Sequence, residues 1–378
     1  MGLDVQIYFI IHSVLFLCIF LDFLNVKRST RNIVLIFVVV IITLFGGLRW
    51  QTGSDWYQYH YHFMHSDLAN IFAQKKDSTG RFLEPGFVFV NALIKHVFGT
   101  FWMYNLITTG FIQFIRYKVC KTLCGEYALT AYCAMMILST NYFSIRAGFG
   151  MGVALASFYF IQQRHIKGFL FTNIASYLIH VQGIVMFPFY WIGHIKLNWK
   201  IFIVILLSMS SLAYFFQSQF TAFASAFDNT SAGSLAMHYA EHYETVSDGS
   251  RVRGASTILM NVVYSALFLY VRQKKHLEKD FWYNSLLNMF LVQTGIYIVF
   301  SNGMSDICRI AGMLIFAKVL LMIESVKYFR EFGKKWQYHI VLLFYAIYLI
   351  SKIKNLDHSP FFYICNVPYR TIFDYNLL

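Results

Sequence analysis

Long apolar runs constrain the fold of this chain more than any other feature. A run of roughly 17–20 apolar residues can cross the ~30 Å hydrocarbon core of a bilayer as a helix. Candidate runs begin near residues 5, 33, 100, 127, 147, 168, 182, 200, 255, 282, 308 and 338. Only 13% of the 378 residues are charged, against about 25% in a soluble domain. We therefore predict an all-α polytopic membrane protein of about twelve transmembrane helices that forms one integral domain over residues 1–378.

The charge pattern predicts the orientation of these helices. The formal net charge is +13, but the basic residues lie in short links between apolar runs, which disfavours nucleic acid as a partner and leaves membrane lipid. Basic links alternate along the chain with links of mixed charge, and the latter include two long loops at about residues 49–86 and 217–254. Basic links of membrane proteins stay in the cytoplasm, so the two long loops are predicted to face outward.

One segment between these links is expected to enter the membrane without crossing it. The apolar piece from Phe87 to Phe98 is interrupted by Lys95 and ends before Gly99. A stretch of 10–14 apolar residues is too short for a span and is often interfacial or re-entrant. The following piece, from Phe101 to Ile115, is the predicted span.

The densest polar motif follows the second apolar run and contains Arg49, Gly53 and Asp55. An arginine offers a planar fork suited to phosphate, and Asp55 could orient that arginine or act as a base. The alternative is an aromatic belt in which an Arg–Asp pair only fixes the loop. Aromatic rings are surfaces on which sugars stack, and the candidates for sugar contact are Trp50, Trp56, Tyr57 and Tyr59.

Three further residues combine charge with an expected position at a membrane interface. Glu84 precedes Pro85, so it could be catalytic or only cap a helix N-terminus. Arg146 lies in a turn between apolar runs, where a charge usually faces a cavity or a partner, unless it reaches to the interface. His180 interrupts an apolar stretch and is either a general base or a structural histidine.

The second half of the chain offers cations and one acid for the same outer face. Arg251 and Arg253 close the long loop, and Arg309 follows Asp306 at the start of an apolar run. His238 and His242 would share a helix face but lack the HExxH pattern and a third ligand, so no metal site is predicted. No other cofactor is predicted.

These positions would bring several arginines to one level of the membrane, and they are Arg49, Arg146, Arg251 or Arg253, and Arg309. Two unit charges of the same sign 4 Å apart repel by about 4 kcal/mol at an effective dielectric of 20. A dianionic ligand such as a diphosphate would relieve that repulsion. The topology alone therefore indicates an anionic ligand at the outer face.

The order of these motifs resembles the EpsG family, which belongs with the Wzy-type polysaccharide polymerases of bacterial envelopes. The resemblance is carried by Arg49 with Gly53-Ser54-Asp55, by Glu84-Pro85-Gly86-Phe87, by Ile145-Arg146 and by His180. It covers about residues 45–185 well, whereas the C-terminal half matches mainly in hydropathy and in Arg309. The usual first motif reads roughly R…GTDY, and serine and tryptophan replace two of its residues here.

The resemblance implies a fold and an activity. The expected architecture is that of the C-type glycosyltransferases, all-helical with the site at the outer interface of the bacterial plasma membrane. The enzyme would join oligosaccharide repeat units carried on undecaprenyl diphosphate into O-antigen or exopolysaccharide, with diphosphate as the leaving group. The family also implies a chain-length regulator as a partner.

The residue roles that this resemblance suggests stay hypotheses. The arginines would hold the leaving diphosphate, Asp55 is the first choice for the base, and Glu84 and His180 are the second. Two other functions compete with polymerisation. A transporter that flips the lipid-linked unit would usually show two related halves, and none is evident in the sequence. A ligase or acyltransferase on the same carrier would transfer only once.

Overall fold

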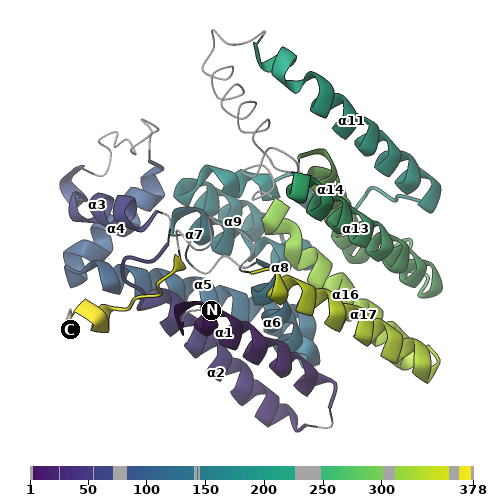
Figure 1. The fold of residues 1–378 in the computed structure, drawn as a ribbon, viewed down its shortest axis with the longest axis horizontal. Coiled ribbons are helices and arrows are strands. Elements are labelled where there is room, and N and C mark those ends of the chain that lie inside the picture. Colours follow the sequence, from purple (N-terminus) through teal and green to yellow (C-terminus); the bar gives the residue numbers. More distant parts are fainter. Residues whose placement is uncertain are drawn as a thin grey trace. The chain divides into compact units, whose positions relative to one another are not determined.

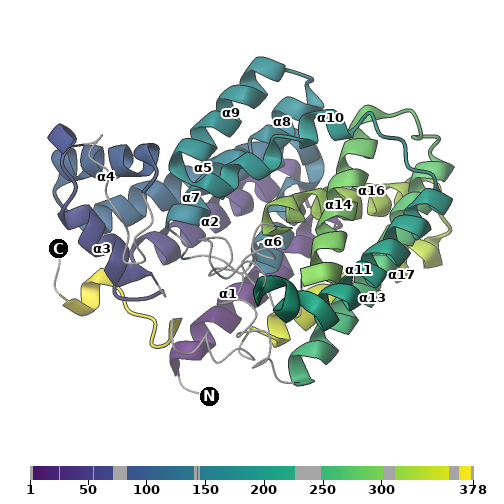
Figure 2. The ribbon, with the colours of Figure 1, turned by 90° about the horizontal axis from the view of Figure 1, so that it is seen from above.

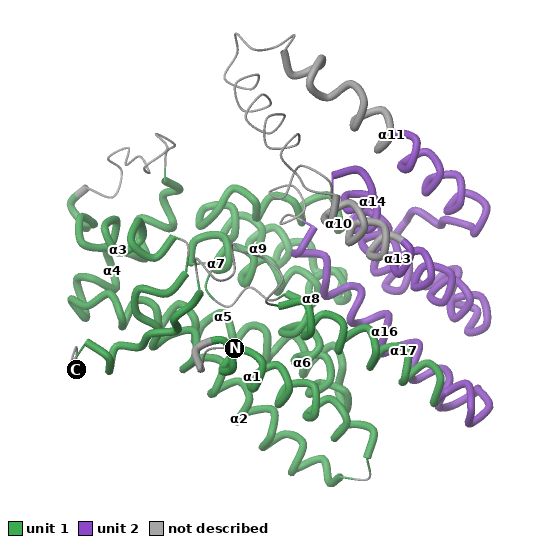
Figure 3. Tube along the Cα trace, viewed as in Figure 1, with its two compact units in different colours: residues 1–190, 339–378 green, residues 191–338 purple. Residues whose placement is uncertain are grey.

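The computed structural model describes residues 3–24, 26–53, 55–70, 83–139, 143, 145–225, 248–300, 311–356 and 366–375. These residues form helices and turns and include no β-strand, so the predicted all-α fold is confirmed. An isolated bridge pairs Arg49 with Thr371. The sequence predicts a single domain, and the chain divides into two compact units, residues 1–190 with 339–378 and residues 191–338 (Figure 3).

The first unit, unit 1, carries most of the predicted site motifs (Figure 1). Its longer helices are α1 (Leu3–Ile19), α2 (Arg28–Gly47), α4 (Pro85–Phe98), α5 (Phe101–Cys124), α6 (Ala128–Ser139), α9 (Ile166–Ile179) and α17 (Lys335–Lys354), the last of which begins just before the unit boundary. Its shorter elements are η1 (Phe20–Asp22), α3 (Trp56–Met64), η2 (Leu68–Asn70), η3 (Gly125–Tyr127), α7 (Arg146–Ala154), α8 (Ser157–Gln162), η4 (Val181–Met186), α10 (Phe189–Ile192) and η6 (Ile372–Tyr375).

Helix α5 lies at the centre of unit 1, where it packs against α2, α4, α6 and α7. It begins two residues after Gly99, whose left-handed backbone (φ +71°) ends α4 and turns the chain. A β-carbon on Gly47 would lie 2.8 Å from Leu106 Cα, so this glycine lets α2 approach α5 closely. The predicted span from Phe101 to Ile115 thus lies within α5, and the predicted interfacial piece is α4.

The second unit, unit 2, is built from α11 (Trp199–Ser225), α13 (Asp248–Lys274), α14 (Phe281–Phe300), η5 (Gly312–Leu314) and α16 (Ile315–Glu331). Helix α14 packs against α11, α13 and α16. Two cations lie buried between these helices and are held by amide oxygens. Arg272 donates to Asn284 Oδ1 over 3.1 Å, and Lys318 donates to Asn261 Oδ1 over 3.0 Å.

Three helices of the described residues are long and apolar enough to cross a membrane: Val5–Asp22, Arg28–Gly47 and Lys335–Lys354. The described residues also contain shorter apolar helices at Pro85–Phe98, Ile166–Ile179, Val181–Ile192 and Trp199–Leu212. The chain is therefore a membrane protein, whereas about twelve spans and the C-type architecture stay predictions. Apolarity alone overestimates span length here, since residues 146–192 fold as several short helices, including α7, α8 and α9 (Figure 2).

The two predicted outer loops contain helices. The segment at residues 49–86 includes α3 and η2 and ends in the first residues of α4. Of the segment at residues 217–254, residues 217–225 complete α11 and residues 248–254 begin α13, while residues 226–247 lie outside the described residues. His238 and His242 therefore lie outside them as well.

Candidate functional site

Glu84 is the centre of an ionic group that joins three helices of unit 1. It occupies the N-cap position of α4, but its side chain makes no capping hydrogen bond. Its Oε1 instead accepts a hydrogen bond from the Val181 backbone N–H (3.0 Å) and lies 2.9 Å from His180 Nδ1. Its Oε2 lies 3.6 Å from Arg146 Nε. The sequence left open whether Glu84 caps a helix or has a functional role. The observed geometry shows that its side chain does not cap α4.

His180 reaches Glu84 because the backbone turns sharply after α9. His180 ends α9 in an extended conformation (φ −157°, ψ 129°), and η4 follows directly. A β-carbon on Gly150 would lie 2.8 Å from His180 Cβ, and one on Gly86 would lie 2.7 Å from the Leu178 carbonyl oxygen. Only glycine at these two positions lets α7 and α4 approach the end of α9 this closely. The Glu-Pro-Gly sequence therefore has a packing reason for its glycine.

The electrostatics of this group favour an ionised carboxylate. Burial raises the pKa of Glu84, but the hydrogen bonds from His180 and the Val181 N–H and the charge of Arg146 more than offset it, so that the pKa lies below its ordinary value. An ionised carboxylate can only accept hydrogen bonds, so His180 Nδ1 carries the proton in this contact. The imidazole Nε2 is then the nitrogen available to accept a proton, provided that the ring is neutral.

Arg49 is buried just beyond the end of α2 and, among the described residues, forms no ion pair with an acid. Its side chain is 2% exposed, its guanidinium carbon lies 4.8 Å from the centre of the Phe143 ring, and its Nε has no hydrogen-bond partner. Burial lowers its pKa to about 10, a shift that the charge of Asp55 partly opposes, so Arg49 keeps its charge at neutral pH. The Asp55 side chain is exposed and, among the described residues, forms no ion pair with Arg49.

The C-terminal segment holds the backbone around Arg49. Trp50 N–H donates to the Arg370 carbonyl oxygen (2.8 Å), and Ile372 N–H donates to the Leu48 carbonyl oxygen (3.0 Å). The Tyr369 hydroxyl donates to the Phe45 carbonyl oxygen (2.7 Å). Residues 366–375 therefore pair with the backbone on both sides of Arg49, a contact that the sequence did not indicate.

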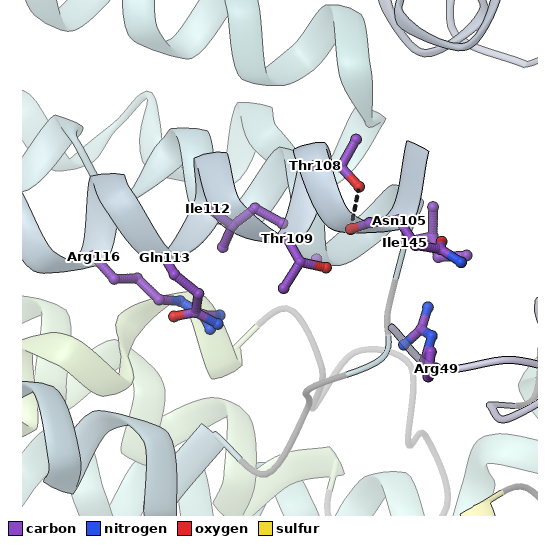
Figure 4. A pocket seen from close by; sticks show the side chains of 9 residues that line it. Arg49, Asn105, Thr108, Thr109, Ile112, Gln113, Arg116 and Ile145 are labelled. Carbon is purple, nitrogen blue, oxygen red and sulfur yellow. Dashed lines mark hydrogen bonds between the residues drawn. The ribbon is translucent and has the colours of Figure 1, made fainter. Parts of the chain in front are cut away.

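A small polar cavity adjoins Arg49. It measures about 20 Å³, and α5 provides most of its wall (Figure 4). Its lining residues are Arg49, Asn105, Thr108, Thr109, Ile112, Gln113, Arg116, Ile145 and Gly148. In Figure 4, Arg49 lies at the Asn105 end of α5, and Gln113 and Arg116 lie at the other end. Ile145 and Gly148 flank Arg146, so the first turn of α7 borders both this cavity and the ionic group around Glu84.

The aromatic candidates divide into buried and exposed rings. Trp56 and Tyr59 belong to the apolar core of unit 1, and the Trp56 ring lies 4.7 Å from Trp50 and stacks on His60. Tyr57 is 64% exposed, and Tyr61, one helical turn further along α3, is 59% exposed. The exposed pair offers ring faces to a ligand, and the sequence reading did not include Tyr61.

The remaining predicted residues belong to unit 2 or lie outside the described residues. Arg251 and Arg253 lie in α13 of unit 2. Asp306 and Arg309 lie outside the described residues. The described residues contain no group of three or more His, Cys, Asp or Glu side chains that could hold a metal ion.

Fold and site together define an all-helical membrane protein with buried cationic and carboxylate groups gathered around one short helix. The sequence model of the EpsG family matches residues 32–371, and the chain therefore belongs to the EpsG family. Members of that family are Wzy-type polysaccharide polymerases, enzymes of the glycosyltransferase type. No curated protein and no solved structure matches the chain significantly.

Proposed function

We propose that this protein polymerises oligosaccharide repeat units carried on undecaprenyl diphosphate at the outer face of the bacterial plasma membrane. Family membership supports polymerisation, and the alternation of basic and mixed links supports the orientation. The observation that carries the chemistry is the group formed by Glu84, His180 and Arg146, since it combines an oriented imidazole with a fixed cation.

The reaction transfers a glycosyl group. A hydroxyl of the acceptor unit attacks the anomeric carbon of the donor sugar, the bond from that carbon to the diphosphate oxygen breaks, and undecaprenyl diphosphate leaves. His180 Nε2 accepts the hydroxyl proton, and Glu84 holds the ring in the required tautomer. Asp55, the first choice from sequence, is the weaker candidate base, because no described side chain fixes its carboxylate.

The leaving diphosphate is held by arginines. Arg49 and Arg146 carry positive charge in a partly or fully buried setting, where preorganised charge stabilises a developing anion most effectively. Arg309, with Arg251 or Arg253, completes this set in the proposal. Tyr57 is the best-placed aromatic for a sugar contact, because Trp50 is only partly exposed and Trp56 and Tyr59 are buried. Asp306 would contact sugar hydroxyls.

The test is polymerisation by the purified protein supplied with lipid-linked repeat units. The wild type and an Arg28→Ala control, which removes an exposed arginine at the other end of α2, should form a ladder of long products. Arg49→Ala and Arg146→Ala should each reduce the rate on the order of 10²-fold or more. Full-length ladders from both variants at normal protein levels would show that the diphosphate assignment is wrong. A single transfer would indicate a ligase, and no reaction by the wild type would favour transport.

A further inference from the structure

The cavity beside Arg49 contains polar atoms that no protein group satisfies. Asn105 is 1% exposed, and neither its amide nitrogen nor its amide oxygen has a hydrogen-bond partner. Arg49 Nε is in the same condition. Buried polar groups are nearly always hydrogen-bonded, and leaving a buried cation without compensation is costly. Two such residues lining one cavity therefore indicate that a ligand forms hydrogen bonds with them in the functional state.

The lining chemistry selects the charge of that occupant. Arg49 is a cation at the Asn105 end of α5, and Asn105 and Thr109 can both donate hydrogen bonds. No Asp or Glu is among the described residues that line the cavity. A cation would be repelled here, and a neutral ligand would leave the charge of Arg49 uncompensated. The occupant that fits is an oxyanion.

The size of the cavity selects how much of that oxyanion enters. A cavity of about 20 Å³ admits about one oxygen-sized group, since a water molecule needs roughly 10–15 Å³. A sugar ring does not fit, whereas one oxygen of a phosphoryl group does. Gly148 contributes no side chain to the wall, so the first turn of α7 leaves this space open while Arg146 on the same turn faces Glu84.

We propose that this cavity binds a phosphoryl oxygen of a diphosphate, and that Asn105 is a substrate-binding residue which donates its amide N–H to that oxygen beside Arg49. Thr109, one turn further along α5, is the second donor within the cavity. The inference rests on the proposed function for the identity of the diphosphate carrier, but the binding of an anion by Asn105 can be measured without turnover.

Asn105→Leu separates a binding role from a structural one. Leucine has the same branched shape and removes two buried polar atoms that have no partner, so the free energy of unfolding of the unliganded protein should stay the same or increase. Binding of inorganic diphosphate and of undecaprenyl diphosphate should weaken about tenfold or more, because a hydrogen bond to a charged group is lost. Asn105→Asp should weaken it further, since the new carboxylate repels the anion.

The matched control is Asn91→Leu in α4. Asn91 is equally buried, but its amide nitrogen donates to the Phe87 carbonyl oxygen (2.8 Å). Its replacement should therefore lower the free energy of unfolding and leave anion affinity unchanged, the reverse of the pattern at Asn105.

Binding is measured on the purified full-length protein by thermal-shift titration with inorganic diphosphate, undecaprenyl diphosphate and undecaprenol. Binding of inorganic diphosphate identifies a site for a free anion, and binding of the lipid diphosphate alone identifies a lipid headgroup site; either supports the proposal. Equal affinity of Asn105→Leu and wild type, or binding of undecaprenol as tight as that of the lipid diphosphate, overturns it. Asn105-dependent anion binding by a protein that does not polymerise would overturn the proposed function and leave this site standing.

Discussion

The two polar groups on either side of the first turn of α7 differ in how their charges are balanced. Around Glu84, a carboxylate faces an arginine and an imidazole, and every charge has a partner on a neighbouring element. Around Arg49, a buried cation faces an aromatic ring and an amide, and no carboxylate of the described residues forms an ion pair with it. The first group is held by its own ion pairs and hydrogen bonds, and in our proposal the second gains its counter-charge from the bound diphosphate. Changes in the first group should therefore affect both stability and activity, and changes in the second mainly activity.

Glu84→Gln should have the largest effect. Glutamine keeps the size of the side chain and one acceptor oxygen, but it removes the charge that balances Arg146 and turns the second acceptor oxygen into an NH2 donor. That donor would face either Arg146 or the N–H groups of His180 and Val181. We expect the polymerisation rate to fall on the order of 10²-fold and the free energy of unfolding to fall by about 1–3 kcal/mol. Product ladders and thermal unfolding of the purified protein measure the two effects.

Glu126→Gln is the control for this substitution, because the Glu126 side chain is exposed in the same unit and makes no described side-chain bond. It should leave both quantities unchanged. A Glu84→Gln protein that is fully active but less stable would reduce the group around Glu84 to a structural role.

The pH dependence of stability should report the same carboxylate. The pKa of Glu84 is lowered in the folded protein from its ordinary value of 4.5, so the unfolded chain binds its proton at higher pH than the folded one does. Its contribution is therefore fully present above pH 4.5 and is lost as the pH falls through the folded pKa. The stability of the wild type, measured by thermal unfolding, should fall more steeply below pH 4.5 than that of Glu84→Gln.

The difference between these two proteins isolates Glu84. Asp374, whose pKa is lowered by hydrogen bonds from Thr371, contributes equally to both. If the stability of the two proteins changed equally with pH over this range, the partners of Glu84 would not stabilise its ionised form in the folded state.

Gly150→Ala should have a smaller effect on the polymerisation rate, and it tests whether the placement of His180 matters. The added β-carbon would lie 2.8 Å from His180 Cβ, so the end of α9 must shift. We expect a loss of about 1–3 kcal/mol in the free energy of unfolding and a reduced polymerisation rate. Gly110→Ala is the control, because its added β-carbon would meet Thr43 at an ordinary 3.5 Å. Equal rates for both variants would contradict a catalytic position for His180.

The sequence predicted the members of these groups better than their arrangement. Glu84, Arg146 and His180 each stood out as a polar residue beside apolar runs, but their meeting depends on α4, α7 and α9 packing through two glycines, which spacing along the chain does not encode. Asn105 was missed, although Asn105, Thr109 and Gln113 recur every four residues in an apolar helix, a readable polar stripe. The contact of Thr371 with Arg49 had no local signal, because it joins segments far apart in the chain.

Tyr57→Ala should have the smallest effect, and it tests whether the comparison extends to the sugars. Tyr57 is 64% exposed on α3, so its removal should leave the free energy of unfolding unchanged. Loss of one ring that stacks on a sugar is worth about 1 kcal/mol, so the rate at low acceptor concentration should fall roughly fivefold. Tyr61→Ala, one turn away, should behave alike, and the double variant should show whether both rings contact one sugar. Trp56→Ala, by contrast, should destabilise the protein, because the Trp56 ring is buried in the apolar core of unit 1. An unchanged rate in the Tyr57→Ala and Tyr61→Ala double variant would move the sugar groove away from α3 and restrict the site to the two groups that border α7.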